Sequence, residues 1–175
     1  WAVIGSLAVV FLYILLRFRR WQFSLGAVAA VFHDVLIVLG IFSATSALMP
    51  FSMEIDQAFI AAILTVIGYS LNDTIIVFDR IRENSRKYHR QPYEHVINRS
   101  INETLNRTLL TSLTTLFVAA TLYFLGGPVI HDFAFALIVG VVVGTYSSIF
   151  VASPVLIAWE AKFSSPGVRA KGKRR

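Results

Sequence analysis

Five long apolar runs dominate this sequence of 175 residues and restrict what it can fold into. Most of them reach the ~20 residues that an α-helix needs to cross ~30 Å of hydrocarbon. Hydrophobic residues make up 56% of the chain and charged residues 15%, a balance too apolar for an ordinary soluble domain of this length. We therefore expect an all-α, polytopic membrane helix bundle. Its five transmembrane helices are predicted at about residues 1–16, 23–48, 58–78, 105–125 and 133–159.

The basic residues indicate how these helices are oriented. All sixteen Lys and Arg residues fall in segments 17–20, 80–107 and 162–175, the first, third and fifth connections when the tail is counted. The other connections, 49–57 and 126–132, contain acidic residues and no Lys or Arg. Because cytoplasmic loops carry an excess of Lys and Arg, the basic connections and the C-terminus are predicted to be cytoplasmic. The net charge of +6 is then explained without a nucleic-acid partner.

The chain divides into a transmembrane domain, residues 1–160, and a basic cytoplasmic tail, residues 161–175. After Pro92, apolar residues recur at helical spacing, which predicts a cytoplasmic amphipathic helix at about 92–104 that turns into the fourth span. The first run lacks a preceding methionine or basic segment, so we expect a truncated or incompletely resolved chain rather than a signal peptide. Cysteine is absent, and no metal site or cofactor is expected.

One carboxylate, Asp73, lies inside the third apolar run. An ionisable group in a membrane span costs roughly 2.5 to 3.5 kcal/mol on insertion scales, so its default interpretation is functional. Tyr69, Ser70, Asn72 and Thr74 surround it within six residues, which predicts a polar cluster on this helix. The alternative is that Asp73 only fixes helix packing through a buried hydrogen bond.

Arg107 is the predicted partner of Asp73. It enters the fourth span from the cytoplasmic side, and its long side chain could reach the depth of Asp73 on the adjacent helix. An arginine–carboxylate pair is the least costly way to hold both charges in a low dielectric. Threonines at spacings of four, three and four, including Thr111, give this helix one hydroxylated face. The alternative is that Arg107 snorkels to lipid phosphate.

A second carboxylate, Asp34, is expected near the middle of the bilayer, at ~16 Å of depth in the second span. Two interpretations are open. In the first, Asp34 is protonated, or is capped by His33 or by a hydroxyl on a neighbouring helix, and holds the bundle together; in the second, it belongs to a proton route.

Small residues recur every four positions in the last span and predict a groove that allows another helix to approach closely. They are Ala136, Gly140, Gly144, Ser148 and Ala152.

The motifs together resemble those of the SecF family, the smaller subunits of the SecD/SecF complex of bacterial protein export. The resemblance is carried by residues 68–74 (GYSLNDT), 77–84 (VFDRIREN), 32–34 (FHD) and 106–108 (NRT). This family belongs to the resistance-nodulation-division superfamily. Its members have six spans with a periplasmic domain between the first two, so this chain resembles spans two to six.

The resemblance implies a proton-driven machine of the bacterial inner membrane that pulls translocating preprotein from the outer side. The implied partners are SecD, the SecYEG translocon, other Sec accessory membrane proteins, the preprotein and membrane lipids. Asp73 and Arg107 correspond to charged residues of the family's proton path, which faces a carboxylate of SecD; Asp34 acquires no established role. No enzymatic activity is expected.

Other function classes compete with this one. The chain could be a passive structural subunit of the export complex, or an exporter of small molecules or lipids from the same superfamily. Intramembrane aspartyl proteolysis by Asp34 and Asp73 is disfavoured, because the Gly-x-Gly-Asp pattern of such enzymes is absent.

Overall fold

A computed structural model describes residues 2–18, 20–45 and 55–163. These residues are helical almost throughout and contain no strand, which confirms the predicted all-α membrane helix bundle. The last part of the predicted second span and most of the predicted basic tail lie outside the described residues. The helices are α1 (Ala2–Phe18), α2 (Trp21–Thr45), α3 (Gln57–Lys87), α4 (Tyr93–Leu125), α5 (His131–Ser147) and α6 (Ser153–Phe163), with a 3₁₀ turn at Pro128–Ile130 and a π-helical turn at Ser148–Ala152.

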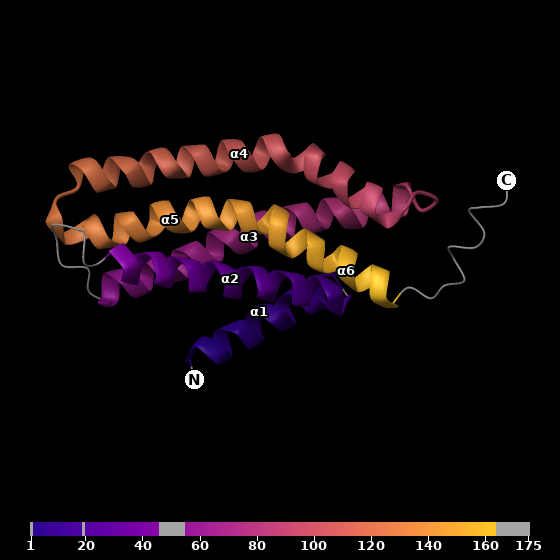
Figure 1. Ribbon diagram of the computed structural model, residues 1–175, viewed down its shortest axis with the longest axis horizontal. Helices are drawn as coiled ribbons and strands as arrows, with labels where there is room; N and C mark the ends of the chain where they lie inside the picture. The colour runs from indigo at the N-terminus through magenta and orange to yellow at the C-terminus, as the bar shows by residue number, and fades with distance from the viewer. Residues whose placement is uncertain (1, 19, 46–54, 164–175) are drawn as a thin grey trace.

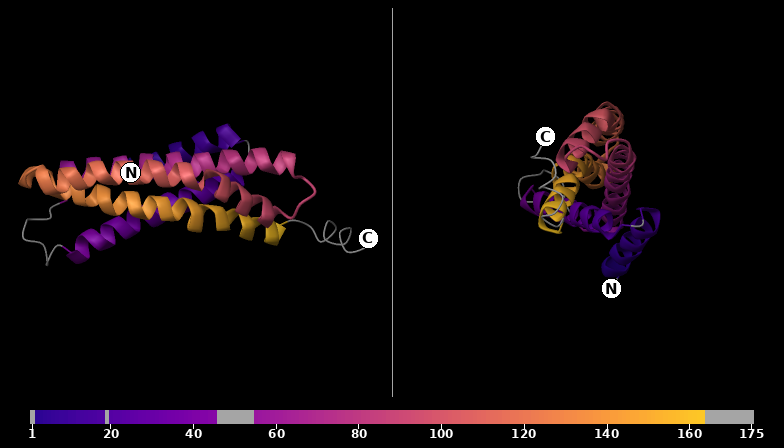
Figure 2. Two further views of the ribbon diagram at one scale, coloured as in Figure 1. Left: turned by 90° about the horizontal axis from the view of Figure 1, so that it is seen from above. Right: turned by 90° about the vertical axis from the view of Figure 1, so that its right-hand side faces the viewer.

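The long helices form an elongated bundle (Figure 1). Helices α3, α4 and α5 pack against one another, and α2 packs against α3 and α5. Helix α1 packs mainly on α2, and the end-on view shows it standing away from the rest of the bundle (Figure 2). The bundle therefore has a closely packed group, α2 to α6, and one peripheral helix.

Helix α3 is longer than the apolar run that predicted it. It begins at an N-cap, where the Asp56 carboxylate accepts a hydrogen bond of 2.8 Å from the Phe59 amide, and it continues nine residues beyond Phe78. Helix α4 also exceeds its predicted span, because the predicted segments 92–104 and 105–125 form one continuous helix. The polar ends of both helices thus extend past the apolar part of the bundle.

The last predicted span is one helical run that contains a π-helical turn between α5 and α6. Pro154 lies two residues after the end of the turn, and a proline cannot donate the backbone hydrogen bond that a regular α-helix needs at that position. The Ser153 hydroxyl donates to the Ser148 carbonyl at 3.2 Å, which satisfies one of the polar groups in the wide turn. Apolar composition alone did not predict this turn.

The core consists of two apolar clusters with a polar layer between them. Along α2, the first cluster ends at Ala30 and the second begins at Val38. Along α3, which runs the other way, the second cluster ends at Val66 and the first begins at Val77. Four of the buried polar residues fall in these gaps, namely Asp34, Ser70, Asp73 and Thr74.

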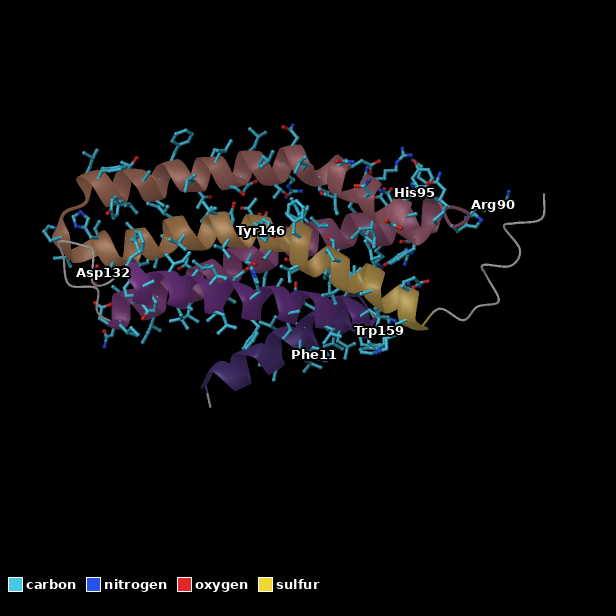
Figure 3. All side chains as sticks on the ribbon, viewed as in Figure 1. Phe11, Arg90, His95, Asp132, Tyr146 and Trp159 are labelled. Atoms are coloured by element: carbon cyan, nitrogen blue, oxygen red, sulfur yellow. The ribbon has the colours of Figure 1, made fainter. Side chains whose placement is uncertain are left out.

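The outer surface of the bundle is apolar, as a lipid-facing surface should be. Helices α2, α3 and α4, and the run Pro128–Lys162, are long and apolar enough to cross a membrane, whereas α1 is shorter. Asp132 lies at one end of the long axis, and Arg90 and His95 lie at the other (Figure 3). The described acidic and basic connections are therefore at opposite ends.

Candidate functional site: two buried carboxylates

Asp73 lies inside the bundle on α3 and is fully buried. Among the described residues, neither of its carboxylate oxygens has a hydrogen-bond partner. Thr74, beside it, is also buried, and Val77, one turn further on, packs in the apolar core. A carboxylate in such a position is costly when charged and unpaired, so Asp73 is suited to a change of protonation or of partner.

Arg107, on α4, is exposed on the surface of the described chain. Its charge acts electrostatically on Asp73, but the described structure contains no hydrogen bond or ion pair between the two side chains. The Arg107 carbonyl accepts a hydrogen bond of 2.8 Å from the Thr111 hydroxyl. The direct pair expected from the sequence is therefore not formed here, although the two residues act on each other across α3 and α4.

Asp34, by contrast, is fully buried and well supplied with partners. The hydroxyls of Ser70 on α3 and Ser147 on α5 donate to its Oδ2 atom at 2.5 and 2.7 Å. His33 Nδ1 lies 3.1 Å from its Oδ1 atom. Both predicted forms of capping, by His33 and by hydroxyls on neighbouring helices, are present. Asp34 thus joins α2, α3 and α5.

The close approach of α3 and α5 makes this contact possible. A Cβ atom at Gly140 would lie 2.1 Å from Val66 Cγ2, and one at Gly144 would lie 3.1 Å from Ser70 Cβ. All five residues of the small-residue groove are buried. Gly140 and Gly144 of the predicted groove therefore pack against α3, whereas its end at Ala152 packs against Gly26 on α2.

A second chain of hydroxyls connects α3, α4 and α5. Tyr69 Oη donates to Ser112 Oγ at 3.0 Å, and Ser112 Oγ lies 2.6 Å from Thr145 Oγ1. Tyr69 is one turn from Asp73 and interacts with it electrostatically. This chain of hydroxyls therefore borders the unpartnered carboxylate on the side of α4.

The predicted polar cluster is only partly assembled. Ser70 and Asp34 meet directly and Tyr69 joins Ser112, whereas Asn72 is exposed. The sequence analysis missed Ser112, Thr145 and Ser147. Ser112 could have been found, because it continues the four-residue spacing of Thr104 and Thr108 on the buried face of α4.

At the basic end, a network of polar contacts joins α3 to α4. Glu103 accepts hydrogen bonds from Arg80 Nε at 2.6 Å, Asn84 Nδ2 at 2.9 Å and Arg99 Nε at 2.9 Å. Arg80 also pairs with Glu83 at 2.7 Å. This network fixes the long ends of α3 and α4 against each other, close to Arg107.

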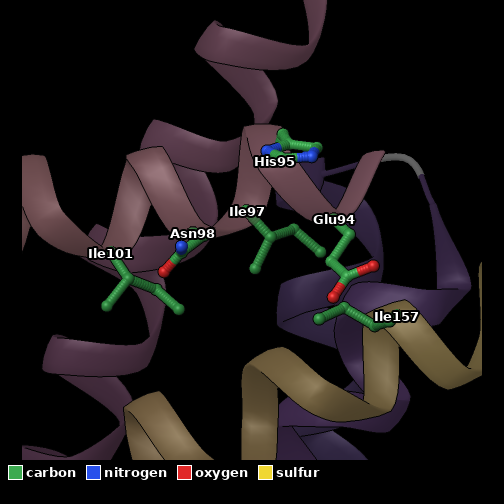
Figure 4. A pocket seen from close by; sticks show the side chains of 6 residues that line it. All are labelled: Glu94, His95, Ile97, Asn98, Ile101 and Ile157. Atoms are coloured by element: carbon green, nitrogen blue, oxygen red, sulfur yellow. The ribbon is translucent and has the colours of Figure 1, made fainter. Parts of the chain in front are cut away.

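A pocket of about 390 Å³ opens between the start of α4 and α6 (Figure 4). It lies at the basic end, away from both buried carboxylates. Within the described ranges, no group of three or more His, Cys, Asp or Glu residues could hold a metal ion. The pocket is lined by Glu94, His95, Ile97, Asn98, Ile101 and Ile157.

The sequence matches the family model described as "Protein export membrane protein SecD/SecF, C-terminal" over residues 1–162. Among curated proteins, it is 59% identical over 162 residues to the protein translocase subunit SecF of Rhodothermus marinus, covering 93% of this chain and 52% of that protein. It is 48% identical over 159 residues to the protein translocase subunit SecDF of Thermus thermophilus, covering 91% of this chain and 21% of that protein. The chain spans about half the length of the SecF relatives that it matches.

Two solved structures resemble the fold closely. The structure of SecDF in a super-membrane-facing form superposes with a TM-score of 0.86 at 46% identity and covers 97% of this chain and 22% of that one. The structure of SecDF from Thermus, described as a translocon-associated membrane protein, gives a TM-score of 0.81 at 49% identity, with 91% and 21% covered.

Proposed function

Because this chain belongs to the SecD/SecF family of protein-export membrane proteins, we propose that it is the transmembrane part of a SecF-type subunit that couples proton movement to protein export. The observation that supports this proposal best is the fully buried Asp73 carboxylate, which has no hydrogen-bond partner among the described residues. A purely structural carboxylate would be expected to resemble Asp34, whose oxygens are all engaged.

The proposed partner in the membrane is SecD. Two observations support it: relatives exist in which the two subunits are one protein, SecDF, and the Arg107 side of α4 is exposed in this chain. SecD would cover this side, where a carboxylate of SecD would face Arg107. The description of the Thermus protein as translocon-associated supports SecYEG, and with it the preprotein, as further partners. The membrane is proposed to be the bacterial inner membrane.

In the proposed mechanism, Asp73 alternates between a charged form, attracted to Arg107, and a protonated form that releases it. The two forms favour different packings of α3 against α4, and this difference moves the part of the protein outside the membrane. One charge crossing ~100 mV supplies ~2.3 kcal/mol, which shifts a two-state equilibrium about fiftyfold. A single proton is therefore enough to bias such a change.

The test is export into inner-membrane vesicles that contain the full-length protein with Asp73→Asn. Asparagine has nearly the same shape but cannot take up a proton, so we expect the proton-dependent part of export to be lost while the subunit still assembles. Asp79→Asn is the matched control, because Asp79 lies on the same helix, is exposed and pairs only at the surface with Arg17 at 3.3 Å. Normal proton-dependent export by Asp73→Asn would refute the proposal.

The rival proposal is a passive subunit that holds the complex together, and Arg107→Lys separates the two. Lysine keeps the charge but changes its geometry and hydration. If Asp73 and Arg107 form a tuned charge pair, vesicles that contain the variant should lose much of their proton-dependent export. If the subunit is passive, vesicles that contain the variant should export as much preprotein as those with the wild type.

A further inference from the structure

A second pocket, of about 340 Å³, opens where the connection between α1 and α2 meets the C-terminal part of α3. It lies at the basic end of the bundle and belongs to neither buried carboxylate. Its volume falls in the range of small-molecule sites, roughly 300 to 1,000 Å³. The residues that line it are Phe18, Arg20, Phe23, Arg82, Ser85 and Arg86.

Three arginines line this pocket, and none of its described lining residues is acidic. Arg82 and Arg86 are four positions apart on α3, a spacing at which like charges repel. The nearby carboxylate of Asp79 already pairs with Arg17. Arg80 on the same helix pairs with the carboxylates of Glu83 and Glu103, whereas Arg82 Nη1 donates to the backbone carbonyl of Arg17 at 3.5 Å. The pocket thus concentrates positive charge that an anion would neutralise.

The remaining wall of the pocket is aromatic. The rings of Phe18 and Phe23 stack with centroids 5.2 Å apart, and both side chains are almost entirely buried. Next to them, Trp21 is exposed and packs against Trp159 with ring centroids 4.2 Å apart. Tryptophans are enriched at the depth of lipid headgroups, so this pair indicates that the pocket lies at the membrane surface.

We propose that this pocket binds the phosphate group of an anionic phospholipid from the adjoining leaflet. Arginine forks match phosphate oxygens, and basic pockets between membrane helices suit anionic headgroups. The acyl chains would follow the exposed apolar side chains of α1, where Leu12 and Leu16 are 54% and 70% exposed. The pocket between α4 and α6 does not suit such a ligand, because Glu94 lines it.

The experiment compares lipid retained by the full-length protein and by a variant with Arg82→Gln and Arg86→Gln. Each is purified in detergent with equal amounts of phosphatidylglycerol and phosphatidylcholine and washed in ~1 M salt, where the Debye length of ~3 Å suppresses diffuse surface attraction. The bound lipids are then extracted and quantified. The matched control is Lys87→Gln with Arg90→Gln, which removes two charges from the same segment outside the pocket lining.

We expect the wild type and the control to retain phosphatidylglycerol in preference to phosphatidylcholine. The pocket variant should retain about twenty-fivefold less phosphatidylglycerol, at roughly a fivefold loss for each arginine. Should the double variant prove unstable to heat, Arg86→Gln alone should show about a fivefold loss.

Two results would overturn the proposal. Equal losses in the pocket variant and the control would mean that the whole basic surface attracts lipid. Failure of the wild type to retain phosphatidylglycerol in preference to phosphatidylcholine, together with binding of inorganic phosphate that the pocket variant loses, would mean that the pocket holds free phosphate and not a lipid headgroup.

Discussion

At the scale of single residues, two aspartates on adjacent helices of one bundle differ in the partners that surround them. Asp34 is held by two serine hydroxyls and a histidine, and Asp73 has no hydrogen-bond partner among the described residues. Both carboxylates are fully buried. Because burial is the same, the difference in partners indicates different tasks: Asp34 joins helices, and Asp73 is proposed to change its protonation state.

Asp34→Ala tests the first of these tasks. Hydrogen bonds between membrane helices contribute ~0.6 kcal/mol each on average, so loss of three partners should lower the free energy of unfolding by about 2 kcal/mol. Asp34→Asn keeps one acceptor oxygen and should cost about half as much. Reversible unfolding in bicelles measures both. Asp79→Ala, which removes an exposed pair, should cost less than ~1 kcal/mol, and an equal loss in all three variants would contradict the account.

At the scale of helices, the contact between α3 and α5 positions the hydroxyl partners of Asp34. Gly140→Ala would place a Cβ atom 2.1 Å from Val66 Cγ2, and such overpacking should destabilise the bundle by about 1 to 3 kcal/mol. Adding Val66→Ala should restore most of the lost stability, as measured by the same unfolding method. Gly68→Ala is the control, because nothing lies within 4 Å of its added Cβ atom. Equal stability of Gly140→Ala and Gly68→Ala would show that the contact is not tight.

The sequence was sufficient to predict the helices and the small-residue groove, because apolar length and four-residue spacing are local properties. It did not predict how far α3 continues beyond its apolar part into the polar segment. Helix α3 extends to Lys87 because its ionic side chains find partners on α4, and such partners are set by packing. The π-helical turn at Ser148–Ala152 was not predicted, because the residues around it are as apolar as the rest of the span.

The site was predicted less completely than the fold. Asp34 and Asp73 are conspicuous as charges in apolar runs, but Ser147 is an ordinary residue in sequence. Its role depends on a turn of α5 that faces α2 and α3. The pairing of Asp73 with Arg107 remains a prediction, because the structure places the residues on neighbouring helices without a direct contact.

At the scale of the whole molecule, the described charges are divided between the two ends, and we propose that the basic end is cytoplasmic. Single cysteines at Arg90 and Val129 in an otherwise cysteine-free protein test this orientation. A membrane-impermeant maleimide applied to spheroplasts should label Val129→Cys, whose native side chain is 88% exposed, and should label Arg90→Cys only after permeabilisation. The reverse pattern would contradict the proposed topology.

Proton flux across the membrane is the property that the proposed role of Asp73 controls. The full-length protein is reconstituted with SecD in liposomes that contain a pH-sensitive dye, and an inward proton gradient is imposed. We expect the wild type and Asp79→Asn to acidify the interior, and Asp73→Asn to do so no faster than protein-free liposomes. Acidification by Asp73→Asn at the wild-type rate would show that protons do not pass through this carboxylate.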